Sequence, residues 1–114
     1  MSYFKTDEFK CSCCGVVIVS SWLIHLLNKV REAYGKPMVV NSGYRCKKHN
    51  KKVGGKKNSA HLRGTAADIK CTNSAIRYSI IKYAFEVGFK RIGIYDKFIH
   101  LDVDGELPLE VLWR

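Results

Sequence analysis

The chain has 114 residues, 46% of them hydrophobic, and carries a formal net charge of +10 at pH 7. This apolar content suffices for one hydrophobic core, so we expect a single domain over residues 1–114. No apolar run approaches the roughly 18 residues of a membrane-spanning helix. The N-terminal sequence MSYFKTDEFK lacks the apolar segment of a secretory signal. We therefore expect a protein that is cytoplasmic as synthesised.

The first predicted helix follows Ser20 and Ser21, either of which can cap its N-terminus. Its apolar residues recur at spacings of three and four, which places them on one face. They are Leu23, Leu26, Leu27, Val30 and Tyr34. Gly35 ends this helix, and Pro37 prevents its continuation. His25 falls on the polar side, and we expect it on the surface.

A short strand is predicted at residues 37–41, followed by a turn at 41–43. A long polar loop then leads to His61. The segment 65–70 predicts a buried strand. A second helix begins after Asn73 or Ser74 and ends at Gly88. Its expected buried face consists of Ile76, Ile80, Ala84 and Val87.

The segments 91–95 and 98–103 predict a β-hairpin joined through Asp96 and Lys97. The pattern of the last nine residues, 106–114, does not fix a conformation, although Leu112 and Trp113 could cover the sheet or a pocket. Together these elements predict an α+β domain with a small antiparallel sheet and two main helices packed on it.

Lysines are concentrated in residues 47–57, the sequence KKHNKKVGGKK. Such a surface attracts polyanions, and nucleic acid is the first partner to consider. However, the sequence shows no recognition helix, no aromatic RNA-binding strand and no paired-cysteine finger. Bacterial envelopes are also polyanionic. Two interpretations therefore stay open: a solvated face, or an attractor for an acidic cell wall.

His61, Asp68 and His100 are candidate metal ligands. Asp68 lies in an otherwise apolar strand, where a carboxylate needs a cation or hydrogen bonds; a salt bridge to a lysine is the alternative. Two imidazoles and one carboxylate form a ligand set for a zinc ion (Zn2+) with one open coordination position. Such a position suits hydrolytic chemistry, because bound zinc makes water a usable nucleophile.

The strand at residues 98–102 alternates apolar and polar residues. Alternation places Phe98, His100 and Asp102 on one face, and Ile99 and Leu101 on the opposite, buried face. The strand therefore predicts a metal ligand on the sheet with a carboxylate beside it.

The five cysteines are residues 11, 13, 14, 46 and 71. An odd count without a signal peptide argues against a disulfide framework. The cluster at 11–14 could bind a metal together with Cys46, but its spacing matches no zinc finger closely. We favour reduced side chains packed near a turn.

The segments SGYRC, KKHN, VGG, SAHLRGTAADI and GIYDKFIHLDV resemble the zinc D-alanyl-D-alanine peptidases of bacterial cell walls, from about residue 3 to residue 103. The resemblance implies the hedgehog-like zinc peptidase fold, with His61, Asp68 and His100 as zinc ligands. Arg45 corresponds to the residue that holds the terminal carboxylate of the substrate, although a loop-fixing ion pair is the alternative. Ser59 either hydrogen-bonds substrate or caps its loop.

At the positions where the family has its general base, this chain has different residues. Many relatives have an acidic residue three positions before the last histidine ligand, where this chain has Lys97; others have a histidine two positions before it, where this chain has Phe98. The carboxylates nearby are Asp102, which shares the face of His100, and Asp96 in the turn. We favour Asp102 as the base, with Asp96 second.

The resemblance also bears on the cysteines. Relatives are expected to begin with FxCxCCG and to have a cysteine after the tyrosine–arginine pair, which would bring Cys11 close to Cys46. A disulfide bond or a structural zinc ion is therefore an alternative to reduced, packed thiols.

The function that the resemblance implies is zinc-dependent hydrolysis of peptidoglycan stem peptides or cross-links, as a D,D-carboxypeptidase or endopeptidase. A phage-type lytic enzyme, released by another route to act on the anionic cell wall, fits a small basic domain. We expect a monomer. The alternatives are a catalytically silent zinc-carrying binding module, as the hedgehog amino-terminal domain illustrates, and a basic nucleic-acid-binding protein.

Overall fold

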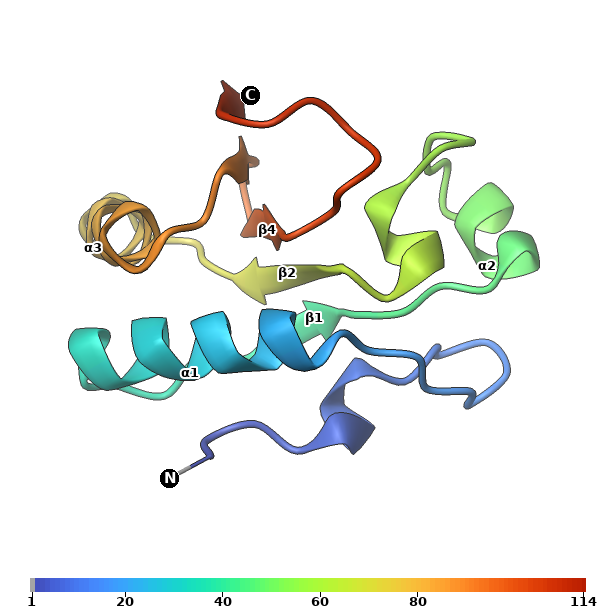
Figure 1. Ribbon diagram of the computed structural model, residues 1–114, viewed down its shortest axis with the longest axis horizontal. Coiled ribbons are helices and arrows are strands. Elements are labelled where there is room, and N and C mark those ends of the chain that lie inside the picture. Colours follow the sequence, from blue (N-terminus) through green and yellow to red (C-terminus); the bar gives the residue numbers. More distant parts are fainter. Residues whose placement is uncertain (1) are drawn as a thin grey trace.

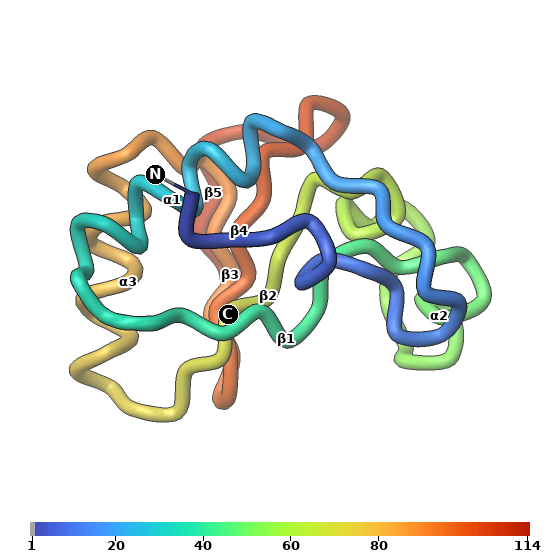
Figure 2. Tube along the Cα trace, turned by 90° about the horizontal axis from the view of Figure 1, so that it is seen from below, coloured from blue at the N-terminus to red at the C-terminus, as the bar shows by residue number. Residues whose placement is uncertain are grey.

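The structure, a computed structural model, describes residues 2–114. Two long helices, α1 (Ser21–Tyr34) and α3 (Ser74–Val87), pack against each other and lie on the same side of a five-stranded sheet (Figures 1 and 2). The strands are β1 (Val40–Ser42), β2 (Ala66–Lys70), β3 (Arg91–Ile94), β4 (Phe98–Asp102) and β5 (Val111–Trp113), in the spatial order β1-β2-β4-β3-β5. The predicted α+β class with two main helices is confirmed.

The sheet differs from the prediction at one edge. Strands β1, β2, β4 and β3 pair antiparallel, as expected. The C-terminal strand β5, however, pairs parallel to β3, so that the sheet as a whole is mixed. The chain reaches this position through residues 103–110, a wide loop that leaves the end of β4 and returns to the sheet on the far side of β3 (Figure 1).

Side-chain alternation divides the sheet into an apolar face and a polar face. Ile69, Ile99 and Ile92 belong to the hydrophobic core beneath the helices and are fully buried. On the opposite face, Asp68 lies directly across from His100 in the β2–β4 register. Because directly opposed residues share a face, the register alone brings these two polar side chains together.

Helix α1 forms as the sequence predicts. The Ser20 Oγ accepts a hydrogen bond from the Leu23 backbone N–H (3.3 Å), and Gly35 ends the helix in the left-handed conformation. Its predicted apolar face is buried in the core, at Leu23, Leu26, Leu27 and Val30, and Tyr34 packs partly buried against it.

Helix α3 is capped by Asn73, whose side chain accepts from the backbone N–H groups of the first turn. Ile80 and Ala84 are buried as predicted, and Val87 packs partly buried against the core. The expectation for Ile76 is wrong: this residue is 37% exposed, because the core contacts of α3 begin at Ile80.

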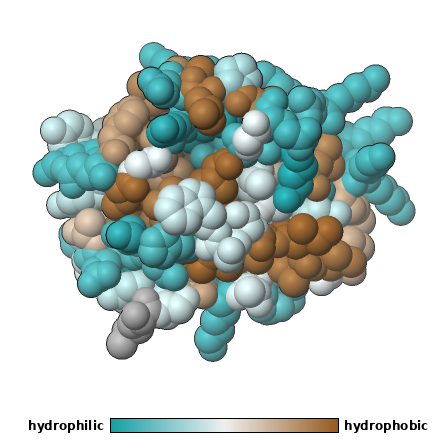
Figure 3. All heavy atoms as spheres, in the orientation of Figure 1, coloured by the Kyte–Doolittle hydropathy of each residue, from teal (hydrophilic) through white to brown (hydrophobic). Residues whose placement is uncertain are grey.

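The predicted polar loop before His61 contains two short helices, α2 (Lys47–Lys52) and the 3-10 helix η2 (Ala60–Arg63). A further 3-10 helix, η1 (Thr6–Phe9), lies near the N-terminus. All six lysines of residues 47–57 are exposed. Long hydrophilic side chains project from the margins of the face seen in Figure 3. Within residues 2–114, no helix has the length and apolar character needed to cross a membrane.

Gly93 of β3 allows the C-terminal strand to place a large side chain on the polar face. In the β3–β5 register Gly93 is the partner of Trp113. A Cβ atom at Gly93 would come within 2.6 Å of the indole ring. The Trp113 Nε1–H donates to the Tyr95 hydroxyl (2.9 Å), which fixes the ring in place.

We therefore predict that Gly93→Ala displaces Trp113 and lowers the free energy of unfolding by about 1–3 kcal/mol, the usual cost of overpacking. Denaturant unfolding followed by tryptophan fluorescence measures this effect. Gly105→Ala is the matched control, because a Cβ atom there has no neighbour within 4 Å among the described residues. Equal stability of the two variants would contradict the prediction.

Candidate metal centre

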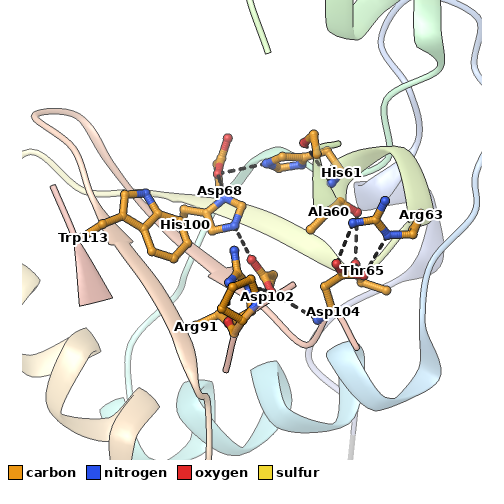
Figure 4. A network of polar contacts seen from close by, with 12 residues as sticks. Ala60, His61, Arg63, Thr65, Asp68, Arg91, His100, Asp102, Asp104 and Trp113 are labelled. Carbon is orange, nitrogen blue, oxygen red and sulfur yellow. Dashed lines mark hydrogen bonds and ion pairs between the residues drawn. The ribbon is translucent and has the colours of Figure 1, made fainter. Parts of the chain in front are cut away.

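Three side chains from different elements converge above the polar face of the sheet. His61 comes from η2, Asp68 from β2 and His100 from β4 (Figure 4). The Asp68 Oδ1 lies 3.2 Å from the His61 Nε2 and 3.1 Å from the His100 Nδ1. One ligand atom from each residue lies within 4.8 Å of the other two. The three sequence-predicted ligands therefore share one site.

The His61 ring is oriented by a backbone carbonyl. Its Nδ1 lies 2.7 Å from the Gly43 oxygen, which can only accept, so Nδ1 donates and Nε2 is the ring nitrogen that faces Asp68. Gly43 itself approaches the backbone of Phe9 so closely that a Cβ atom would lie 2.6 Å from the Phe9 Cα. Glycine at this position is what allows the carbonyl to reach His61.

The His100 ring is oriented by a carboxylate. Its Nε2 lies 2.6 Å from the Asp102 Oδ2. The other oxygen of Asp102 accepts from the Arg91 Nε (2.8 Å) and from the Asp104 backbone N–H (3.1 Å). The Trp113 ring lies 5.2 Å from the His100 ring and shields it from one side. His100 therefore presents its Nδ1 to Asp68.

The charges around His100 favour a bound cation. Burial alone would lower the pKa of His100, but hydrogen bonds and charge from Asp102 and Asp68 raise it. Burial alone would likewise raise the pKa of Asp68, but His100 and His61 hold it well below its usual range. Negative potential that stabilises an imidazolium also stabilises a metal cation in the same place.

The donor set fits zinc. Ligand atoms about 2.0–2.1 Å from a tetrahedral zinc ion are about 3.3 Å from one another. The two contacts from the Asp68 Oδ1 to the histidine nitrogens, 3.2 and 3.1 Å, are close to that spacing. Two nitrogens and one oxygen are also ligands that zinc accepts.

Arg45 lies beside the centre and contacts one of its ligands. Its Nη2 donates to the Asp68 Oδ2 (3.1 Å), its Nε to the Ser42 hydroxyl (3.1 Å) and its Nη1 to the Asn50 side chain (3.3 Å). A guanidinium has five N–H donors, so two remain. Arg45 also lines a hollow of about 220 Å3, together with Tyr44.

The remaining predicted site residues lie elsewhere. The Ser59 hydroxyl accepts from the His61 backbone N–H (3.2 Å), so it caps η2. Asp96 is exposed in the β3–β4 turn, where its carbonyl accepts from Arg77 (2.8 Å). Of the two histidines outside the centre, His49 lies within 3.1 Å of the Ser12 hydroxyl, and His25 is exposed on α1 as predicted.

Sequence analysis missed Arg91 and Arg63. Arg63 makes a two-point contact with the buried Asp104, at 2.8 and 2.6 Å. Together with Arg45–Asp68 and Arg91–Asp102, three aspartates on this side of the molecule each have an arginine partner. The Arg91–Asp102 pair could have been predicted, because a hairpin turning between Asp96 and Lys97 places these residues opposite each other.

Fold and site together define a class: a small α+β domain with two histidines and one aspartate that could hold a metal ion on the polar face of its sheet. A sequence model of the peptidase M15 family matches residues 2–102. The chain therefore belongs to the peptidase M15 family, which confirms the predicted family and indicates a metallopeptidase; M15 peptidases are zinc-dependent. Among curated proteins, none matches the chain significantly.

The Asp104–Arg63 contact predicts a pH-dependent contribution to stability. Hydrogen bonding to Arg63 lowers the pKa of Asp104, so the contact stabilises the fold above the ordinary aspartate pKa of about 3.9 and is lost as the pH falls through the lowered value. Asp104→Asn should reduce the free energy of unfolding by about 1–3 kcal/mol at pH 7.

Denaturant titrations between pH 7 and pH 2 measure this difference, which should shrink below about pH 4. Glu106→Gln is the matched control, since Glu106 also contacts Arg63 but is largely exposed. Its effect should stay below about 1 kcal/mol. A constant Asp104→Asn difference across the whole pH range would contradict the assignment.

Proposed function

We propose that this protein hydrolyses peptide bonds of bacterial peptidoglycan, in stem peptides or in cross-links, with a zinc ion held by His61, Asp68 and His100. The observation that supports this most is the convergence of the three ligand atoms on the polar face of the sheet, in a chain of the peptidase M15 family. A D,D-carboxypeptidase and an endopeptidase share this chemistry and differ in the bond that they cleave.

A zinc ion in such a site supplies a Lewis acid and an activated water when bound, because three protein ligands leave one position open. The protein's contribution is orientation. The Gly43 carbonyl fixes the His61 ring, and Asp102 fixes the His100 ring. These contacts remove rotational freedom from both imidazoles before a ligand arrives.

Arg45 is proposed to bind a carboxylate of the substrate. Its two remaining N–H donors suit a carboxylate, and Arg45 lines a hollow together with residues 42–44 of the same turn. Its side chain is only 15% exposed and is held by Ser42, Asn50 and Asp68, so little freedom is lost on binding. The structural contact with Asp68 and the substrate contact are compatible, because they use different donors.

The general base stays a prediction. The Asp102 side chain is fully buried, and both of its oxygens already accept hydrogen bonds. These contacts favour an orienting role for Asp102. Asp96 has the exposure that a proton-transferring group needs, on the turn that leads into the His100 strand.

The exposed lysines of residues 47–57 support an anionic wall as the place of action. Four of them belong to α2 and two follow it, and α2 lies close to the η2 helix that carries His61. Positive charge near a site raises the encounter rate with an anionic surface, and the gain falls with increasing salt.

The decisive experiment incubates the zinc-loaded protein with purified peptidoglycan fragments and identifies the products by mass spectrometry. We expect peptide cleavage that is lost in the His61→Ala/His100→Ala double variant, which controls for contaminating hydrolases. If the folded, zinc-loaded wild type releases no product from any fragment, the proposal fails and the zinc-carrying binding module takes its place. The enclosed position of Asp102 is the observation that favours that alternative.

A substitution of Arg45 distinguishes its contact with Asp68 from its proposed contact with the substrate carboxylate. Arg45→Lys keeps the charge but loses the planar two-bond contact. Assayed at saturating zinc, kcat/KM for a peptide with a free carboxylate should fall by about 1–3 kcal/mol in transition-state binding, while a carboxyl-amidated peptide should be affected much less. Arg31→Lys, at a half-buried position of α1 where the guanidinium lies over the Tyr3 ring, is the control. Equal losses of kcat/KM on both peptides would show that Arg45 only positions Asp68 and does not bind the substrate carboxylate.

A prediction for Asp102 separates orientation from proton transfer. Asp102→Asn should weaken zinc binding by about 10–100-fold, with activity largely restored when zinc is in excess. Asp96→Asn should keep zinc affinity and lose about 100-fold or more in turnover if the turn supplies the base. Zinc titration together with steady-state kinetics distinguishes the two effects. Normal zinc affinity combined with a 100-fold loss of turnover in Asp102→Asn would instead make Asp102 the base.

A further inference from the structure

A second cluster of metal-binding side chains lies outside the histidine centre. Cys11 and Cys14, from the loop after η1, meet Cys46 at the start of α2, with their sulfur atoms within 4.8 Å of one another. All three are free thiols, as are Cys13 and Cys71. The cluster joins two segments that are 35 residues apart in sequence.

The sulfur spacing fits a shared metal ion and is longer than a disulfide bond. The Cys11 and Cys46 sulfur atoms are 3.7 Å apart. Two thiolates about 2.3 Å from one tetrahedral zinc ion are about 3.8 Å apart, whereas a disulfide requires about 2.05 Å. Thiolates are the soft ligands that select zinc over harder divalent cations.

Backbone N–H groups around the cluster donate hydrogen bonds to the cysteine sulfur atoms. The loop closes on itself through hydrogen bonds from the Gly15 N–H to the Cys11 oxygen and from the Cys11 N–H to the Val16 oxygen, both 2.8 Å. The Cys46 N–H donates to the Cys11 sulfur (3.5 Å), and the His49 N–H donates to the Cys46 sulfur (3.4 Å). Such donors stabilise thiolates.

We propose that Cys11, Cys14 and Cys46 bind a structural zinc ion, separate from the histidine centre. Cys13, which is exposed, lies between Cys11 and Cys14 in the sequence and is a candidate for a fourth ligand. This inference does not depend on the proposed peptidase function, because the ligands and their spacing are independent of any substrate.

The role of this ion follows from what the cysteines adjoin. Cys46 follows Arg45 directly, and the Tyr44 N–H donates to the Phe9 oxygen (2.8 Å) two residues before Cys11. Phe9 in turn packs on Gly43, whose carbonyl orients His61. The zinc ion would therefore brace the turn at residues 43–46, which carries both a ligand-orienting carbonyl and the proposed substrate arginine.

Metal analysis of the full chain, purified under reducing conditions, tests the proposal. We expect two zinc ions per chain in the wild type, one in the His61→Ala/His100→Ala variant and one in the Cys11→Ser/Cys14→Ser/Cys46→Ser variant. Cys71→Ser, a buried cysteine that contacts the Asn73 carbonyl instead, is the control and should keep two.

A spectroscopic measurement avoids reliance on the triple cysteine variant, which could fail to fold. Cobalt(II) loaded into the His61→Ala/His100→Ala variant should show sulfur-to-cobalt charge-transfer absorption. A folded histidine double variant that binds no metal would overturn the proposal. A disulfide bond between Cys11 and Cys46 in protein freshly purified under reducing conditions would also overturn it. Mass spectrometry of the intact protein would show this bond as a mass two hydrogens lower than that of the fully reduced chain.

Discussion

The polar side of this molecule depends on one carboxylate, that of Asp68, in a strand that is otherwise part of the core. Asp68 is only 4% exposed, and an unpaired carboxylate there would cost several kcal/mol. Its oxygens are satisfied by His61 and His100 on one side and by Arg45 on the other. The strand, the 3-10 helix and the turn are therefore positioned by the same buried charge that would bind a metal ion.

The same pairing of an aspartate with an arginine occurs twice more on this side of the molecule. Asp102 is paired with Arg91, and Asp104 with Arg63, so each aspartate that leaves water gains a guanidinium partner. Replacing such pairs by apolar side chains is often neutral for stability, so their presence calls for a reason beyond stability. Here the reason is visible in the contacts: Asp102 orients His100, and the Arg63 pair ties η2, which carries His61, to the segment after β4.

Features that depend on local pattern could be predicted, whereas those that depend on distant partners could not. The helix carrying Leu23 to Val30, and the placement of His100 and Asp102 on one strand face, follow from periodicity. The parallel strand carrying Trp113 depends on the space above Gly93, which only the folded sheet defines. The short helix α2 depends on a cap from the Cys46 sulfur and on the buried Asn50, neither of which is a usual helix signal. Ile76 fits the helical period but lies beyond the core.

The turn at residues 43–46 is where these constraints meet. Its first residue gives a carbonyl to His61, its third residue holds Asp68, and its fourth belongs to the cysteine cluster. A displacement of this turn would therefore change the ring orientation of one metal ligand and the charge partner of another at once. In the proposed arrangement two metal centres hold it from opposite ends. Arg45, fixed between them, can meet an incoming carboxylate without first losing conformational freedom, which is the condition under which a single ion pair contributes most to binding.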